Sequence, residues 1–353
     1  MIWILSNRYM PDLFGLSLFV LSFYFISNKK ILLGGFIGGL MLGTRLSFFP
    51  LLIIPISKSF YKSKNKILFL CSIILGILVW FIPMSLMTGV ENLYNVAYLH
   101  TVGHFTEYGG TAITESNWTK RMTLFLQTIW SDGLGGFWSQ RSKLTLLISI
   151  LYLPALIFGT KAMLNLIRKN ATLRTLFFSI IIYIIWILLF QNIIHKSRHV
   201  LPVVYYLIFI LSYGLYYCYS KNKKIMFSYI FMIFISLSIV TINLATQHQK
   251  PTAIAKISNF LTKKNDIDTI ISIPLINYYL QLHGIKANYI NIKNESDIFQ
   301  IDKKKLKNNF IVIGNFNHLF DDYITVDKNY FYHNPYVNRL WPILELYNYK
   351  NER

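Results

Sequence analysis

Charged side chains are scarce in this sequence. They make up 14% of its 353 residues, whereas soluble domains usually carry about 25%. Hydrophobic residues account for 54% of the chain and aromatic residues for 16%. A large soluble helical core would require polar helix faces, which the apolar segments lack. The balance therefore favours a chain that lies largely in a membrane.

Cysteine is almost absent as well. The two cysteines, Cys71 and Cys218, both lie in apolar segments. They provide neither a disulfide framework nor the spacing of a metal site. We expect both to be inert thiols in the core, and the residues themselves predict no metal site.

The acidic residues are too few to balance the basic ones, and the net charge is +20. Residues 1–245 hold 21 Lys and Arg against five acids, a net charge of +16, so most of the excess belongs to the apolar part. A basic excess can indicate nucleic-acid binding, but here it follows the loops between apolar segments. The sequence therefore predicts no nucleic-acid partner.

Apolar runs of membrane-spanning length divide the first 245 residues. About 20 apolar residues cross the hydrocarbon layer, and shorter runs occur in helices that pair or re-enter. The second and third runs meet at the stretch GTRLS, so one bent helix is an alternative to two, and the count ranges from seven to nine. The sequence predicts about eight spans, near 12–27, 31–44, 47–57, 67–87, 143–160, 174–191, 199–218 and 225–244.

With eight spans, the basic loops all fall on one side of the membrane. That side holds 13 basic residues and no acidic residue, and the positive-inside rule assigns it to the cytoplasm. The residues are Lys29, Lys30, Lys58, Lys62, Lys64, Lys66, Lys161, Arg168, Lys169, Arg174, Lys221, Lys223 and Lys224. The loop 88–142 and the region 246–353 then lie outside. We expect the outer loop to fold into short interfacial helices on the membrane surface.

The region 246–353 differs from the apolar part in its pattern of apolar and polar residues. DIDTIISI, KANYINI and NNFIVIG indicate buried strands, and PLINYYLQLHG and SDIFQIDKKKLK indicate helices between them. Alternating strands and helices predict a small parallel α/β domain. No glycine-rich phosphate loop follows a strand, and Asp321 and Asp322 suit a helix cap or solvated turn better than a metal pair. The chain thus divides into a helical membrane domain, 1–245, and an outer α/β domain, 246–353.

The outer loop contains a candidate substrate-binding turn in GHFTEYGGTA. His104 and Glu107 place titratable groups beside the flexible pair Gly109 and Gly110. Such a turn suits contact with a ligand. The alternative is that the histidine and the glutamate satisfy each other or the backbone.

A second candidate site lies at the outer edge of the membrane. Charged groups that border a bilayer are costly and are therefore candidates for function. The positive-inside rule does not account for basic residues on the outer side, and Arg and Lys bind phosphate well. Ordinary anionic lipid is the simpler ligand. The residues of this edge are Arg8, Asp12, Arg45, His195, Lys196, Arg198 and His199.

These residues carry a family resemblance. QNIIHKSRHVLPVVYYLIF resembles the H-K-x-R-H-x-L-P segment of bacterial integral-membrane glycosyltransferases of the GT-C superfamily, which includes protein mannosyltransferases and lipid A aminoarabinose transferases. RYMPDLFGLSLFVLSFYFI, GGLMLGTRLSFFPLL and GHFTEYGGTAIT with WSDGLGG resemble successive segments of the same proteins. An outer α/β tail suits their C-terminal domain, and the resemblance covers most of the chain.

The resemblance implies sugar transfer outside the bacterial inner (cytoplasmic) membrane, from a polyprenyl-phosphate donor to a lipid or protein acceptor. In that chemistry an acidic residue accepts the acceptor's proton, and cations or a divalent metal ion stabilise the departing phosphate. On this chain Lys196 and Arg198 would hold the carrier phosphate. They would be helped by His195, His199, Arg45 or Arg8.

The catalytic acid is the point of departure from the family. It belongs to the family's first outer loop, and the matching region would precede Met1. The sequence begins directly before a span and without a signal peptide, so we expect an upstream part to be missing. The favoured explanation is a truncated product with lost or impaired activity. The alternatives are a partner polypeptide that supplies the missing N-terminal helices, or substitution by Asp12, Glu107 or Glu115.

Two further classes of protein compete with a glycosyltransferase. The first is a lipid-binding or scaffold membrane protein without enzymatic activity. The second is a transporter, against which stand the lack of an inverted repeat and the lack of charged residues near mid-span, Arg45 excepted. A carboxylate beside the basic cluster is the feature that separates the enzyme from the lipid-binding protein.

Overall fold

The computed structural model describes residues 11–106, 111–139, 142–191, 197–221, 223–264, 267–292, 309–316, 320, 323–334 and 341–350. The chain divides into two compact units, Met1–Ser238 and Ile239–Arg353. The sequence places the boundary at 245/246, a few residues further along.

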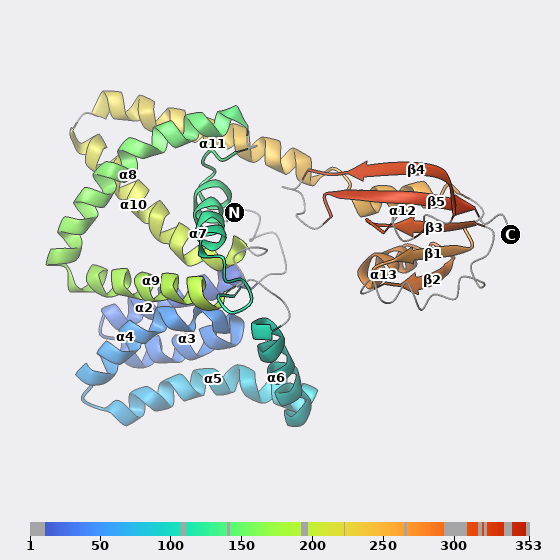
Figure 1. Cartoon of the computed structure of the whole chain (residues 1–353). Coiled ribbons are helices and arrows are strands. Elements are labelled where there is room, and N and C mark those ends of the chain that lie inside the picture. The colour runs from blue at the N-terminus through green and yellow to red at the C-terminus, as the bar shows by residue number, and fades with distance from the viewer. Residues whose placement is uncertain are drawn as a thin grey trace. The chain divides into compact units, whose positions relative to one another are not determined.

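Each of the eight apolar runs forms a helix (Figure 1). The helices are α2 (Asp12–Ser27), α3 (Ile31–Thr44), α4 (Phe49–Lys62), α5 (Lys66–Thr88), α8 (Lys143–Lys169), α9 (Ala171–Phe190), α10 (Leu201–Lys221) and α11 (Lys223–His248). Among the described residues, five segments are long and apolar enough to cross a membrane, and they include α5 and α8 to α11. Helices α2 and α3 are apolar but shorter. A multi-pass membrane protein fits this structure, whereas the prediction of eight spans is not confirmed.

The second and third runs form two helices that fold back on each other. Arg45 ends α3 with extended backbone angles (φ −151°, ψ 82°), and the 3₁₀ turn η1 (Leu46–Phe48) leads into α4. A Cβ added at Gly38 of α3 would lie 3.5 Å from Leu52 and 3.9 Å from Ile56 of α4. A single bent helix would keep these residues far apart, so the alternative of one helix is wrong.

Helices α3 and α5 pack unusually close together, side by side in Figure 1. A Cβ at Gly39 would lie 2.3 Å from the carbonyl oxygen of Ile73, and one at Gly76 would lie 2.1 Å from that of Phe36. Trp80 Nε1 donates to the carbonyl oxygen of Gly39 at 3.0 Å. Small residues that allow backbones to approach are typical of helix pairs in membranes.

Other contacts tie the remaining helices together. Gly159 of α8 and Gly214 of α10 form a second close crossing, since a Cβ on either would meet the other helix's backbone. Lys58 Nζ of α4 donates to Thr175 Oγ1 of α9 at 2.7 Å. The prediction that both cysteines are buried is wrong, because Cys71 is exposed on α5 and Cys218 is half-buried on α10.

The loop 88–142, named the outer loop after its predicted side of the membrane, contains helices, as predicted. They are α6 (Val90–Thr106), α7 (Trp118–Gln127) and the π-helical turn η2 (Thr128–Gly133). Helix α6 leaves apolar side chains exposed, among them Val90, Tyr94 and Leu99. Exposed apolar residues on a helix suit contact with lipid, and the interfacial position stays a prediction.

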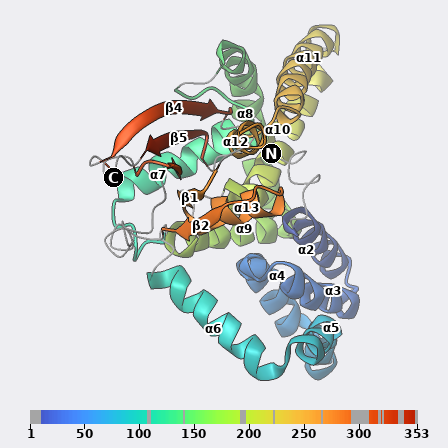
Figure 2. The ribbon, with the colours of Figure 1, turned by 90° about the vertical axis from the view of Figure 1, so that its right-hand side faces the viewer.

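The second unit holds a five-stranded sheet. Its strands are β1 (Thr269–Ser272), β2 (Asn288–Asn291), β3 (Asn309–Ile313), β4 (Ile324–Tyr332) and β5 (Ile343–Lys350), in the order β2-β1-β3-β5-β4. Strand β1 runs parallel to β2 and β3, but β5 is antiparallel to both β3 and β4. Figure 2 shows the arrows of β4 and β5 pointing in opposite directions. The sheet is therefore mixed, and the prediction of a parallel domain is wrong for its last two strands.

The sheet has an aliphatic face and an aromatic face. Helices α12 (Ala253–Leu261) and α13 (Pro274–Leu282) contribute side chains to the aliphatic face, while Phe310 and Tyr349 stack at 5.2 Å on the other. The three predicted strands and the first predicted helix are confirmed. Strand β2 lies at an edge and is partly exposed, so its predicted burial is wrong. The second predicted helix, Asp321 and Asp322 lie outside the described residues.

Candidate functional site

An ion pair joins the beginning of α2 to the end of α3. Arg45 Nε lies 2.8 Å from Asp12 Oδ1, and the Asp12 side chain has no exposed surface. Asp12 is in the first turn of α2, where the helix dipole favours a negative charge. A Cβ at Gly15 would lie 2.7 Å from the Cβ of Arg45. The glycine therefore allows Arg45 to reach the carboxylate.

The same guanidinium reaches the turn before α10. Arg45 Nη2 lies 3.4 Å from His199 Nδ1, and His199 is buried in the 3₁₀ turn η3 (Ser197–Val200). A guanidinium can only donate hydrogen bonds. His199 Nδ1 is therefore the acceptor in this contact.

An aromatic pair supports this arrangement from α9. The hydroxyl of Tyr183 donates to the carbonyl oxygen of His199 at 2.9 Å. The ring of Tyr183 meets that of Phe48 edge to face, with centroids 5.7 Å apart. The guanidinium carbon of Arg45 lies 5.9 Å from the Phe48 ring centroid. The turn η3 is thus fixed to α9, and Arg45 is held between the ring and the carboxylate.

Arg198 extends this cluster electrostatically. Burial lowers the pKa of the Arg45 guanidinium, the Asp12 carboxylate raises it, and the charge of Arg198 lowers it. Arg198 is therefore close enough to act on Arg45. Arg198 directly precedes His199 in η3, so two guanidinium groups lie at this end of the bundle, and guanidinium groups bind anions such as phosphate well.

The outer loop is anchored to the end of the same helix. The last carbonyl groups of a helix lack partners within it, and three groups of the loop donate to those of α9. The hydrogen bonds run from His104 Nε2 to Phe190 O (2.5 Å), from Ala112 N to Leu189 O (2.9 Å) and from the Arg121 guanidinium to Leu188 O. The loop and the turn η3 therefore both lie at the C-terminal end of α9.

Arg121 is a residue of this site that the sequence did not indicate. Its side chain is fully buried, and its guanidinium carbon lies 5.8 Å from the Trp118 ring. A cation at the C-terminal end of a helix is favoured by the helix dipole. The signal in the sequence was the three-residue spacing from Trp118, which places both side chains on one face of α7.

The described acidic candidates are both ion-paired. Lys120 Nζ lies 2.5 Å from Glu115 Oε2. The hydrogen bond from Lys120 and a second one from the Asn117 backbone lower the pKa of the Glu115 carboxyl. A general base that works near neutral pH needs a raised pKa instead. Glu115 therefore suits an ion pair on the surface, and Asp12 is already held by Arg45.

The structure thus brings together three residues of the predicted phosphate cluster, Arg45, Arg198 and His199. Asp12, a candidate for the catalytic acid, lies beside Arg45. His104 lies at the nearby end of α9 through its contact with Phe190, and Glu115 belongs to the outer loop. The other predicted site residues lie outside the described residues. They are Arg8, Glu107, Gly109, Gly110, His195 and Lys196.

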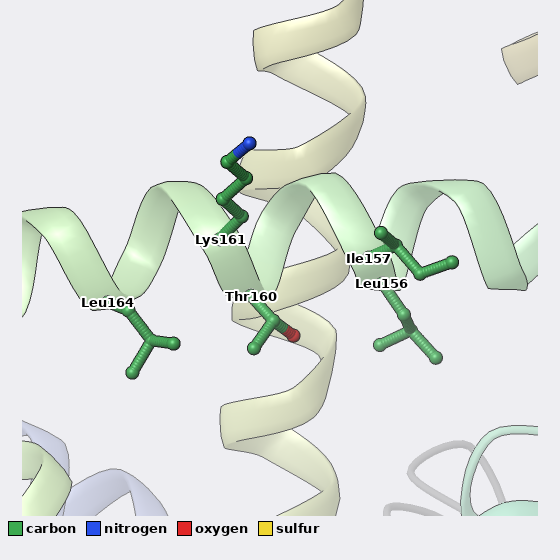
Figure 3. A pocket seen from close by; sticks show the side chains of 5 residues that line it. All are labelled: Leu156, Ile157, Thr160, Lys161 and Leu164. Carbon is green, nitrogen blue, oxygen red and sulfur yellow. The ribbon is translucent and has the colours of Figure 1, made fainter.

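A shallow depression elsewhere on the bundle holds none of these residues. Its volume is about 460 Å³, and its lining is Leu156, Ile157, Thr160, Lys161 and Leu164. All five side chains come from α8, and Lys161 extends away from Leu164 and Thr160 (Figure 3). A lysine on an otherwise apolar helix is typical of residues that reach toward lipid head groups.

Across the described ranges, no group of three His, Cys, Asp or Glu side chains could hold a metal ion. No family model, curated protein or solved structure matches the chain.

Proposed function

We propose that the chain is a multi-pass membrane protein that binds the phosphate of a polyprenyl-phosphate-linked sugar, in the manner of GT-C glycosyltransferases. The observation that carries this proposal is the meeting of Arg45, Arg198 and His199 at the junction of α9 and α10. Basic residues that border apolar helices are costly and are therefore candidates for binding an anion. A guanidinium and a nearby donor suit a phosphate head group, whose polyprenyl chain remains in the lipid.

The proposal places this junction on the outer side of a bacterial cytoplasmic membrane. Basic residues gather at the opposite end of the bundle, where Lys58 contacts the beginning of α9, and that end is assigned to the cytoplasm. The test labels single cysteines in intact cells after Cys71 and Cys218 have been replaced by serine. An impermeant maleimide should label Thr325→Cys and leave Lys62→Cys unlabelled. The reverse pattern refutes the orientation.

Glycosyl transfer sets a further requirement. The bond between the sugar C1 and the phosphate oxygen breaks, the phosphate leaves with the electron pair, and the acceptor oxygen bonds to C1 as its proton passes to a carboxylate. Asp12 and Glu115 are engaged in ion pairs, so neither is assigned this role. In this account the proton acceptor is Glu107 or a carboxylate of a partner polypeptide.

A lipid-binding protein without enzymatic activity is the second candidate. The ion pairs of Asp12 with Arg45 and of Glu115 with Lys120 favour this candidate, because both carboxylates then have a structural role. Both candidates require the phosphate site. They differ only in whether bound polyprenyl-phosphate sugar is consumed.

The test uses the full chain in lipid nanodiscs and measures binding of a polyprenyl monophosphate against the neutral polyprenol. The phosphate should bind at least about ten-fold more tightly, since charge-assisted hydrogen bonds contribute about 1.5–3 kcal/mol each. Arg198→Gln should lose most of this preference. The matched control Lys161→Gln removes a basic residue of the α8 depression and should keep it. Equal affinity for the two lipids would refute the phosphate site.

A second arm separates the enzyme from the lipid-binding protein. A polyprenyl-phosphate sugar is incubated with the nanodiscs and candidate acceptors, and free polyprenyl phosphate is measured. Release that depends on Glu107, and is lost in Glu107→Gln, supports glycosyl transfer. Tight binding without release in wild type supports the second candidate.

A further inference from the structure

We infer that Asp12 and Arg45 are positioning residues that hold His199 as a neutral imidazole with its proton on Nε2, and that Arg45 does not itself bind the phosphate. The chemical form of His199 follows from the structure alone. Its use for a phosphate rests on the proposed function. The family resemblance instead implies that Arg45 helps to bind the phosphate directly.

The guanidinium group of Arg45 already contacts two groups of the protein. Its Nε faces Asp12 Oδ1 at 2.8 Å, and its Nη2 faces His199 Nδ1 at 3.4 Å. The Asp12 side chain is fully buried, and a buried carboxylate strongly retains its partner cation. Arg45 is thereby fixed between two protein groups rather than directed toward a ligand.

The chemistry of the two side chains then sets the form of the imidazole. Arginine stays protonated and offers only donors, so His199 Nδ1 must present its lone pair to Nη2. A neutral imidazole with an unprotonated Nδ1 carries its hydrogen on Nε2. A second proton on the ring would place two cations face to face, which like-charge repulsion disfavours.

Other charged and titratable groups lie on the elements that pack around His199. Arg198 in the same turn adds a positive charge, and Tyr183 of α9 donates to the His199 carbonyl oxygen rather than to the ring. Asp12 of α2 is paired with Arg45. Asp132 is the acidic residue of η2, which also packs against η3. Asp132→Asn is therefore one of the test variants.

His199 and Arg198 then have different roles toward a bound phosphate. His199 Nε2 provides a hydrogen-bond donor in a fixed direction, and Arg198 provides charge. A neutral, correctly oriented imidazole depends on the group at its other nitrogen. Arg45 therefore influences the phosphate through His199.

The first test is NMR of the full chain in nanodiscs, with ¹⁵N-labelled histidine. The sequence has eight histidines, and the His199→Gln difference spectrum assigns the signals of interest. Between pH 7 and pH 5, His199 should show Nε2 bearing a hydrogen and Nδ1 bearing none. Arg45→Met should let Nδ1 take up a proton as the pH falls from 7 to 5, and Asp132→Asn should keep His199 neutral. A wild-type His199 with hydrogen on Nδ1 overturns the inference without any variant.

The second test uses Asp12→Asn in the polyprenyl-monophosphate binding assay. This variant keeps Arg45 and makes the cluster more positive, so direct binding by Arg45 predicts equal or tighter binding. The positioning role predicts weaker binding, by about ten-fold, because Arg45 loses its anchor. Tighter binding would overturn the inference. Failure of wild type to bind polyprenyl phosphate would refute the proposed function while leaving the NMR result intact.

Discussion

Arg45 Nε lies 2.8 Å from Asp12 Oδ1, and the carboxylate has no exposed surface. This contact ties the first turn of α2 to the end of α3, and through His199 it reaches the beginning of α10. The consecutive helices α2 and α3 and the distant turn before α10 therefore meet through one guanidinium. The stability of this end of the bundle and its proposed binding of phosphate depend on the same side chain.

Removal of one partner of this pair should destabilise the protein strongly. Arg45→Met leaves a buried carboxylate without its cation, which typically costs about 3–5 kcal/mol. The double variant Asp12→Asn with Arg45→Met removes both charges and should be less destabilised than the sum of the single variants. Unfolding in detergent, followed by circular dichroism, measures the cycle. Strictly additive costs would show that the two side chains do not interact.

Gly15→Ala tests the approach of Arg45 to α2. The added Cβ would lie 2.7 Å from the Cβ of Arg45, so the guanidinium must move away from Asp12. Overpacking of this kind usually costs about 1–3 kcal/mol, and the polyprenyl-phosphate affinity should fall with it. Ser17→Ala, at an exposed position of the same helix, is the control and should change neither quantity. An unchanged polyprenyl-phosphate affinity in Gly15→Ala would show that phosphate binding does not depend on the ion pair between Asp12 and Arg45.

Neighbouring glycines of α3 should respond differently to the same substitution. Gly39→Ala places a Cβ 2.3 Å from the Ile73 carbonyl oxygen, which is backbone and cannot turn aside. Gly38→Ala meets only side chains, the nearest being Ser22 Oγ at 3.3 Å. We expect a marked loss of thermal stability for Gly39→Ala and a small change for Gly38→Ala. Equal effects would argue against the close α3–α5 crossing.

Arg121→Gln should loosen the outer loop from α9. The substitution removes a buried cation from the Leu188 carbonyl oxygen, and hydrogen bonds of charged groups contribute about 1.5–3 kcal/mol. Hydrogen exchange at the amide of Ala112, which bonds to Leu189, should become at least ten-fold faster. Lys120→Gln removes the adjacent exposed cation and should have little effect. No change in exchange for Arg121→Gln would contradict the anchoring role.

The helices of the first unit could largely be predicted from the sequence. Each apolar run became a helix because a long apolar segment must satisfy its backbone groups internally. The ends were readable too: Asn65 and Asn170 cap α5 and α9 with their side chains, as this residue type usually does. What hydropathy could not decide was whether the short helices α2, α3 and α4 cross a membrane.

Parts of the sheet and of the site could not be predicted from the sequence. Strand β4 is an exposed edge strand with the sequence ITVDKNYFY, so it lacks the apolar run that identified β1 and β3. The cluster of charged residues was found because charge stands out beside apolar helices. That Arg45 pairs with Asp12, and contacts Nδ1 of His199, depends on contacts between distant segments and could not be predicted from sequence.

Photo-crosslinking tests the location of the phosphate site most directly. Benzoylphenylalanine is placed at Leu46, next to Arg45, or at Ile157 of α8, two positions with similar exposure of 69% and 63%. The full chain in nanodiscs is irradiated with a labelled polyprenyl monophosphate. The account predicts labelling at position 46 that unlabelled polyprenyl monophosphate displaces and neutral polyprenol does not, with no such displaceable labelling at position 157. Equal labelling at both positions, or equal displacement by the neutral polyprenol, would contradict it.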